Sequence, residues 1–275
     1  MRVDSHHHLW HYTPEEYGWI DDSMSVLQRD FLPADLTREA SAAGIDATVA
    51  VQARQTLEET HWLLSLAAKS PLIRGVVGWA PIAADVFPAT LSSLTQNSLL
   101  KGLRHVVQAE PDGFLDASAF NRGIASLLPT GLVYDVLILA RQLPEAIRFV
   151  DRHPQQSFVL DHIAKPDIKA NGLAEWKPNI CELSRRPNVA CKLSGMVTEA
   201  EWRTWSPAQL QPYFDTVLDA FGPSRLMFGS DWPVLTVACS YSRWHETVAN
   251  WLDPLTPTER AQIEGGTATK IYRLA

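Results

Sequence analysis

The stretch Asp4-Ser5-His6-His7-His8-Leu9-Trp10 lies near the start of the 275-residue chain, and its first five residues belong to the first predicted strand. Further apolar segments follow along the chain, and most are nearly continuous in Val, Ile, Leu and Ala. Strands that are buried on both faces of a parallel sheet have this composition. The predicted strands are Val3 to His8, Ala47 to Ala53, Ile73 to Ala80, Gly102 to Gln108, Leu132 to Leu139, Ser157 to His162, Val189 to Leu193 and Leu226 to Asp231.

Helical patterns separate the predicted strands. Apolar residues recur at helical spacing from Leu36 to Ala43 and from Leu143 to Val150, and Thr56 with Glu59 predicts a capping box at a helix start. Eight strands that alternate with helices over this length predict an α/β fold, a (β/α)8 TIM barrel, with residues 1–275 as one barrel domain. An open doubly wound sheet is the alternative, but no Gly-x-Gly-x-x-Gly follows the first strand.

The composition favours a cytoplasmic protein that binds neither nucleic acid nor an acidic membrane. Apolar residues make up 46% of the chain, and the formal net charge is -7, which argues against nucleic-acid and acidic-membrane partners. The three cysteines form no Cys-x-x-Cys pair, and no apolar stretch is long enough to span a membrane. The N-terminus shows no apolar signal region, so we expect a cytoplasmic protein, and assembly into a homo-oligomer stays open.

The opening histidines form one half of a candidate metal site. His6 and His8 are two residues apart, so on a strand their side chains point to the same side. In a closed barrel the last strand neighbours the first, and Asp231 at its end can approach the same point. Two imidazoles and a carboxylate are typical ligands of a divalent metal, and Glu110 is a further candidate ligand. The alternative is that the histidines only form hydrogen bonds at the barrel mouth, with Asp231 as a cap.

Other candidate site residues follow the fourth and sixth strands. His162 is a candidate ligand or substrate donor, and Lys165 lies just beyond it. Arg104 and His105 point to opposite sides of their strand, so at most one faces the barrel axis. We expect Arg104 to polarise a carbonyl or bind a carboxylate, with a rim salt bridge as the alternative.

Three further residues stand out in or beside the predicted strands. Asp135 lies within a strand that is otherwise apolar, and because a buried carboxylate needs a partner, we expect it to support the site rather than to catalyse. Trp10 and Trp232 each follow a candidate site residue and would offer flat aromatic surfaces to a sugar-like ring. Packing at the barrel rim is the alternative for both tryptophans.

Five motifs occur in an order and at a spacing that resemble a known family. They are Asp4-Ser5-His6-His7-His8-Leu9-Trp10, Gly102-Leu103-Arg104-His105, Leu160-Asp161-His162-Ile163-Ala164-Lys165-Pro166, Lys192-Leu193-Ser194-Gly195 and Phe228-Gly229-Ser230-Asp231-Trp232-Pro233. Together they resemble the lactonase branch of the amidohydrolase superfamily, which includes fuconolactonase- and rhamnonolactonase-like sugar-lactone hydrolases and, more distantly, pyrone-dicarboxylate lactonase.

The resemblance implies an amidohydrolase-type barrel that opens a sugar lactone to its sugar acid. By motif position, His6 and His8 match the metal-ligating pair, and Asp231 matches the aspartate that activates the hydrolytic water. His162 and Arg104 match positions around the lactone carbonyl. The chain departs from the two-metal members of the superfamily because its fifth strand ends without a histidine, so we expect one divalent metal, such as zinc, or none.

Our hypothesis for the reaction is ester hydrolysis with Asp231 as general base and His162 as a second catalytic group. Arg104, His105 and Lys165 are the predicted polar substrate contacts. A pyrone-dicarboxylate lactonase or a metal-dependent decarboxylase is the first alternative, but it would need several basic residues near the strand ends. A non-catalytic sugar-acid binding barrel is the second, and it would be expected to lack the carboxylate base.

Overall fold

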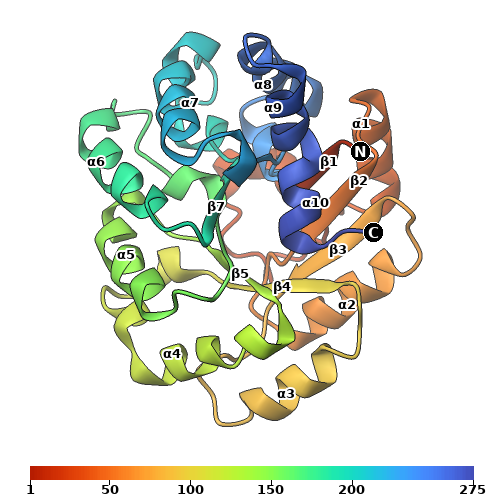
Figure 1. Cartoon of the computed structure of the whole chain (residues 1–275). Coiled ribbons are helices and arrows are strands. Elements are labelled where there is room, and N and C mark those ends of the chain that lie inside the picture. The colour runs from red at the N-terminus through yellow and green to blue at the C-terminus, as the bar shows by residue number, and fades with distance from the viewer.

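The computed structural model describes all 275 residues and confirms the predicted barrel (Figure 1). Eight parallel strands follow one another around a single sheet, each paired with the next in the chain. They are β1 (Val3–His7), β2 (Ala47–Val51), β3 (Ile73–Gly78), β4 (Leu100–His105), β5 (Val133–Val136), β6 (Phe158–Leu160), β7 (Val189–Leu193) and β8 (Leu226–Phe228). Each observed strand falls on one of the predicted segments.

Seven of the eight strands end earlier than predicted, and two of these ends, those of β6 and β8, bear on the site. β6 stops at Leu160 and β8 at Phe228, so His162 and Asp231 lie just beyond their strands. Both residues have a positive φ, 53° for His162 and 59° for Asp231, which is incompatible with extended backbone. The chain therefore turns out of the sheet at the two positions where it presents these side chains.

Helices surround the sheet and connect its strands (Figure 1). They are α1 (Pro33–Ala42), α2 (Leu57–Ala67), α3 (Phe87–Leu94), α4 (Ser118–Ala125), α5 (Leu143–Arg152), α6 (Leu173–Ser184), α7 (Pro207–Phe221), α8 (Tyr241–Leu252), α9 (Pro257–Ala261) and α10 (Thr267–Tyr272). No helix has both the length and the hydropathy needed to cross a membrane.

The start of α2 differs in one detail from the predicted capping box. The Thr56 hydroxyl does accept from the backbone N–H of Glu59, at 3.1 Å. The Glu59 carboxylate, however, accepts from the backbone N–H groups of Ala53 and Arg54 instead of returning to Thr56. Glu59 therefore fixes the loop after β2, which borders the site, rather than closing a capping box.

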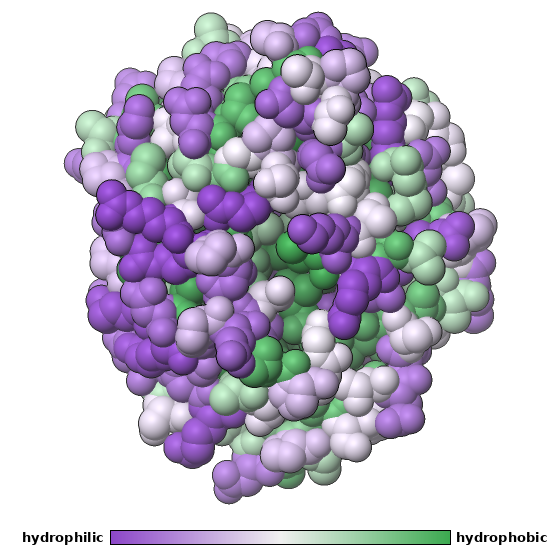
Figure 2. All heavy atoms as spheres, viewed as in Figure 1, coloured by the Kyte–Doolittle hydropathy of each residue, from purple (hydrophilic) through white to green (hydrophobic).

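The two ends of the chain meet on one face of the barrel. Figure 1 shows both termini beside α10, and Figure 2 shows the same face with polar side chains around a central apolar region. Tyr272 at the end of α10 is fully buried, and its hydroxyl donates to the Asp135 carboxylate on β5. The C-terminal helix thus closes this end of the barrel and reaches its interior.

Side chains fill the barrel interior in layers. One layer is apolar and includes Val3, Val49, Val133, Val159, Ala190 and Met227. Side chains two positions further along β5, β6 and β7 point to the same side, because strand residues alternate between faces. These residues are Asp135, Asp161 and Lys192, so a charged layer lies on top of the apolar one. All three are fully buried.

The barrel closes where β1 meets β8. The backbone N–H of His8 donates to the Trp232 carbonyl at 2.7 Å, and that of Asp231 donates to the His6 carbonyl at 2.8 Å. The buried Asp4 carboxylate strengthens this seam. It accepts from the backbone N–H and the hydroxyl of Ser230, at 2.8 and 2.6 Å, and from the Tyr241 hydroxyl at 2.9 Å. Burial raises the pKa of Asp4 to about 6, although these donors act in the opposite direction.

We expect Tyr241→Phe to destabilise the barrel, because the substitution removes one donor from a buried carboxylate. Hydrogen bonds to charged groups contribute about 1.5–3 kcal/mol, so the free energy of unfolding in urea should fall by that amount. Tyr213→Phe is the matched control, since the Tyr213 hydroxyl is buried without a hydrogen-bond partner. Equal stability losses in the two variants would contradict the proposed role of Asp4 in closing the barrel.

Candidate functional site

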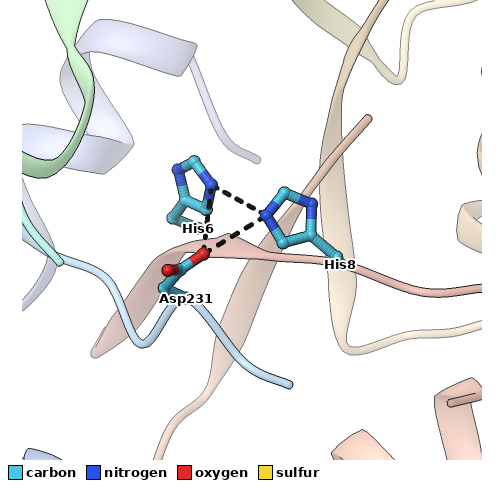
Figure 3. Close-up of side chains that lie close together, drawn as sticks. All are labelled: His6, His8 and Asp231. Carbon is cyan, nitrogen blue, oxygen red and sulfur yellow. Dashed lines mark hydrogen bonds and ion pairs between the residues drawn. The ribbon is translucent and has the colours of Figure 1, made fainter. Parts of the chain in front are cut away.

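Three side chains converge where β1 meets β8 (Figure 3). His6 Nε2 lies 3.2 Å from His8 Nε2, and Asp231 Oδ1 lies 3.3 Å from His8 Nε2 and 3.8 Å from His6 Nε2. The two histidines come from one strand at a spacing of two, and the closure of the barrel brings Asp231 to them. The structure thus brings together three of the four predicted metal ligands.

The hydrogen bonds of the two rings bear on their ability to bind a cation. His8 Nδ1 lies 2.8 Å from the Val51 carbonyl, which can only accept, so the proton is on Nδ1 and Nε2 keeps its lone pair. Burial and the neighbouring Lys192 ammonium hold the pKa of His6 well below its ordinary value, so that ring is neutral. Neutral imidazole is the form that binds metals.

The dimensions of this triangle suit a tetrahedral ion. Metal–nitrogen bonds of about 2.0–2.1 Å at tetrahedral angles place two ligand atoms roughly 3.3 Å apart. The shorter two edges are 3.2 and 3.3 Å, and the third is 3.8 Å. Two imidazole nitrogens and one carboxylate oxygen are also the donor set that zinc accepts. The residues present therefore fit one divalent ion.

His162 reaches the site from a turn of unusual backbone. His162, Ile163, Ala164 and Lys165 all have a positive φ, between 46° and 63°, although none is glycine. Each such residue costs on the order of 1–2 kcal/mol, and strain of this kind is often found at functional sites. His162 Nε2 lies 3.9 Å from Asp231 Oδ1 as a result.

The surroundings of the His162 ring keep it neutral and fixed. Its Nδ1 lies 2.8 Å from the Ser194 hydroxyl. Gly195 packs so closely against the ring that a Cβ there would lie 2.6 Å from it. Burial lowers the pKa of His162 to about 4, although the nearby Asp231 carboxylate opposes this shift. His162 is therefore an uncharged group that can donate or accept a hydrogen bond beside Asp231.

Arg104 faces the barrel axis, and His105 points away from it, as the alternation predicts. The Arg104 guanidinium is buried and lies 3.0 Å from Asp161 Oδ2 and 3.3 Å from His6 Nε2. It also donates to the Gln52 carbonyl. Arg104 is thus a fixed positive charge at the edge of the metal-ligand triangle.

Sequence reasoning left Lys192 and Asp161 out of the site, and the structure places both directly against it. Lys192 Nζ lies 2.6 Å from Asp135 Oδ2, 3.0 Å from Asp161 Oδ1 and 3.1 Å from His6 Nδ1. Although burial alone would raise it, Lys192, His6 and Arg104 hold the pKa of Asp161 well below its ordinary value. Lys192 lies within a strand that is otherwise apolar, and a buried lysine needs a charged partner, so its position in the sequence could have indicated this network.

A cavity of about 820 Å³ opens above the cluster. His8, Arg104, His162, Lys165 and Asp231 all line it, so five of the predicted residues share one space. The long loop after β1 forms part of its wall through Glu15, Glu16 and Trp19. A cavity of this size accommodates a small-molecule substrate.

Four predicted residues lie elsewhere. Glu110 does not join the candidate ligands: its carboxylate lies 2.7 Å from His105 Nε2, and neither residue lines the cavity. His105 is held on its other side, where Nδ1 accepts from the Trp79 indole at 3.2 Å. Its ring also stacks on Phe114. These contacts explain why His105 points away from the barrel axis.

The two predicted tryptophan surfaces are also absent from the cavity. Trp10 is fully buried, and its indole N–H donates to the Arg29 carbonyl. Trp232 packs edge-on against Phe31. The tryptophans that line the cavity are Trp19 and Trp202, which come from loops that strand spacing does not identify. Packing at the rim, the alternative considered for Trp10 and Trp232, describes what the structure shows.

A second group of side chains, His6, Asp161 and His162, also has ligand atoms within 4.8 Å of one another. Asp161, however, is already paired with two cations, Lys192 and Arg104. A metal ion there would meet repulsion from both. The first group, with the Asp231 carboxylate free of any Lys or Arg partner, is therefore the better candidate for a metal.

Comparison with known proteins identifies relatives that match the whole chain. The L-fucono-1,5-lactonase of Burkholderia multivorans is 42% identical over 100% of this chain and 96% of its own length. The L-fucono-1,5-lactonase of Burkholderia ambifaria is 34% identical with the same coverage. The crystal structure of an amidohydrolase from Burkholderia multivorans with bound zinc superposes with a TM-score of 0.98, at 41% identity and 100% coverage of both chains. A family model described as amidohydrolase matches residues 3–274, and the chain belongs to this family.

Proposed function

We propose that the protein hydrolyses a sugar lactone to the corresponding sugar acid, with L-fucono-1,5-lactone as the first substrate to test. The observation that carries the proposal is the cluster of His6, His8, Asp231 and His162 beneath a cavity of about 820 Å³. Full-length similarity to two L-fucono-1,5-lactonases supports the lactone as the reacting group. The reaction is the hydrolysis of a carboxylic ester.

The proposed metal site consists of His6, His8 and Asp231. Zinc is the first ion to test, because a related amidohydrolase crystallised with it and the donor set here suits it. When bound, a divalent ion supplies Lewis-acid polarisation of the lactone carbonyl or of the attacking water.

The chain's own groups carry the proton transfers in this proposal. The His162 and His8 rings hold the pKa of Asp231 below its ordinary value, against the effect of burial, so its carboxylate is ionised. Asp231 accepts a proton from the attacking water as general base. The same proton then passes from Asp231 to the ring oxygen of the lactone as the carbon–oxygen bond breaks. The hydrolysis thus balances without a further proton donor.

Two neighbouring groups are placed to stabilise the negative oxygen that forms on the carbonyl. His162 lies beside Asp231 and lines the cavity. In this proposal the Ser194 hydroxyl donates to His162 Nδ1, so the proton of the ring is on Nε2. Arg104 is a buried cation that also lines the cavity. Fixed donors of this kind stabilise a developing oxyanion without having to reorganise.

The charges of the cavity favour a neutral polyol over a dicarboxylate. Its three cations are already paired: Arg54 with Glu16 at 3.0 Å, Arg104 with Asp161 at 3.0 Å, and Lys165 with Glu199 at 3.5 Å. With Arg104 assigned to the lactone carbonyl and with Arg54 and Lys165 each paired with a glutamate, the two carboxylates of a dicarboxylate would find no free cation. Trp19 and Trp202 offer flat surfaces to the carbon skeleton of a sugar lactone.

A substrate panel tests the proposed reaction. We expect acid release, followed with a pH indicator, from L-fucono-1,5-lactone and related aldonolactones, and little or none from 2-pyrone-4,6-dicarboxylate. The physical reason is the lack of an unpaired cation in the cavity. Preferential turnover of the dicarboxylate would favour the alternative lactonase, and tight sugar binding without turnover would favour a binding protein.

Substituting the proposed base tests the mechanism. Asp231→Asn removes the proton acceptor, so we expect kcat on the best lactone to fall about 10²- to 10⁴-fold, the usual contribution of a general base. Asp85→Asn, at an exposed position, serves as the control and should leave kcat unchanged. Full activity in Asp231→Asn would refute the assignment.

Metal content tests the ligand set independently of turnover. We expect about one zinc per chain in protein incubated with zinc and then desalted, as for a mononuclear site. His8→Ala should lose most of this zinc because it removes one of three ligands. His61→Ala is the matched control, since His61 is exposed on α2. Zinc retention by His8→Ala that equals that of the control would contradict the site.

A further inference from the structure

Lys192 is a fully buried cation surrounded by atoms that could themselves bind a metal. Its Nζ lies 2.6 Å from Asp135 Oδ2, 3.0 Å from Asp161 Oδ1 and 3.1 Å from His6 Nδ1. The two carboxylate oxygens are ligands that a divalent metal accepts, and the Lys192 ammonium now lies between them, beside the His6 ring. No other lysine of the barrel strands is fully buried.

Lys192 lies beside the second metal-capable group of the structure. That group consists of His6, Asp161 and His162, and the ammonium contacts two of its three members. An ion bound there would lie beside a positive charge within a water-poor interior, where repulsion is strongest. The first group consists of His6, His8 and Asp231. Its Asp231 carboxylate lies near His6 Nε2, whereas Lys192 contacts the other ring nitrogen, Nδ1.

The buried charges balance only when Lys192 is present. Lys192 and Arg104 carry two positive charges, and Asp135 and Asp161 carry two negative ones. Removing one partner of a buried ion pair leaves an uncompensated charge, which is strongly unfavourable. Without the lysine, the two aspartates would leave an excess negative charge in this interior, next to the His6 ring. A buried excess of negative charge attracts a divalent cation.

We infer that Lys192 occupies the place of a second metal ion and thereby limits the protein to one. The ammonium is a positioning residue, since it touches His6 and not the substrate cavity. It supplies the positive charge that Asp135 and Asp161 require. His6 Nδ1 lies 3.3 Å from Asp161 Oδ1, and a proton on Nδ1 that is donated to this carboxylate leaves the Nε2 lone pair for the first group. This inference rests on the metal site given under the proposed function.

The experiment counts zinc ions, not turnover. We expect wild-type protein titrated with zinc to bind one ion per chain, and Lys192→Ala to bind two, by calorimetry and by elemental analysis after desalting. Lys101→Ala is the matched control, because Lys101 lies at the surface of β4 and donates only to the Arg273 carbonyl. It should bind one ion, like the wild type.

A second variant separates charge from the space that the side chain fills. Lys192→Met combined with Asp135→Asn keeps the interior filled and its charges balanced, so it should fold and bind one ion. If Lys192→Ala does not fold alone, zinc should restore its folding, seen as a rise in Tm that exceeds the rise in wild type.

The outcomes distinguish this inference from the proposed site. One zinc in both wild type and Lys192→Ala, or a zinc-dependent rise in the Tm of Lys192→Ala that is no larger than the rise in wild type, overturns the role of Lys192 and leaves the first site standing. No zinc in wild type overturns the metal site itself, and this inference with it.

Discussion

The buried carboxylate of Asp4 fastens β1 to β8, and the geometry of the site depends on that seam. Asp4 binds Ser230, one residue before Asp231, while His6 and His8 follow Asp4 on its own strand. The backbone pairing of His6 with Asp231 fixes the same register. Residues more than 220 positions apart in the chain are thereby held within ligand distance of one another. A barrel that failed to close here would keep its helices and lose its site.

A charged layer inside the barrel supports the cluster from below. Lys192, Asp135, Asp161 and Arg104 pair with one another so that the interior carries no net charge. Such a network is costly to desolvate, and an apolar core would be at least as stable. Arg104 and Lys192 each contact one nitrogen of His6. The charged layer therefore sets the electrostatic environment of a candidate metal ligand, which gives its desolvation cost a functional reason.

Periodicity allowed much of the fold to be predicted. Continuous apolar segments identify strands buried on both faces, and every predicted segment overlaps an observed strand. The alternation rule also predicted that Arg104 and His105 point to opposite sides of their strand, and the structure shows which of them faces the axis. Alternation does not apply to Trp10, Trp232 and Glu110, because these residues lie beyond the strands. Trp10 folds back onto the loop after β1, and Glu110 turns toward His105.

The sequence by itself determined the strands, their order and the spacing that puts His6 and His8 on one side of β1, because these depend on local alternation of side chains. It also indicated that Asp231 would lie near them, since closure of a barrel makes its first and last strands neighbours. Only the tertiary structure decided the rest. The left-handed turn at His162, the Lys192 network and the tryptophans of the cavity arise from contacts between segments far apart in the chain, and no local pattern records which distant partner a side chain will meet.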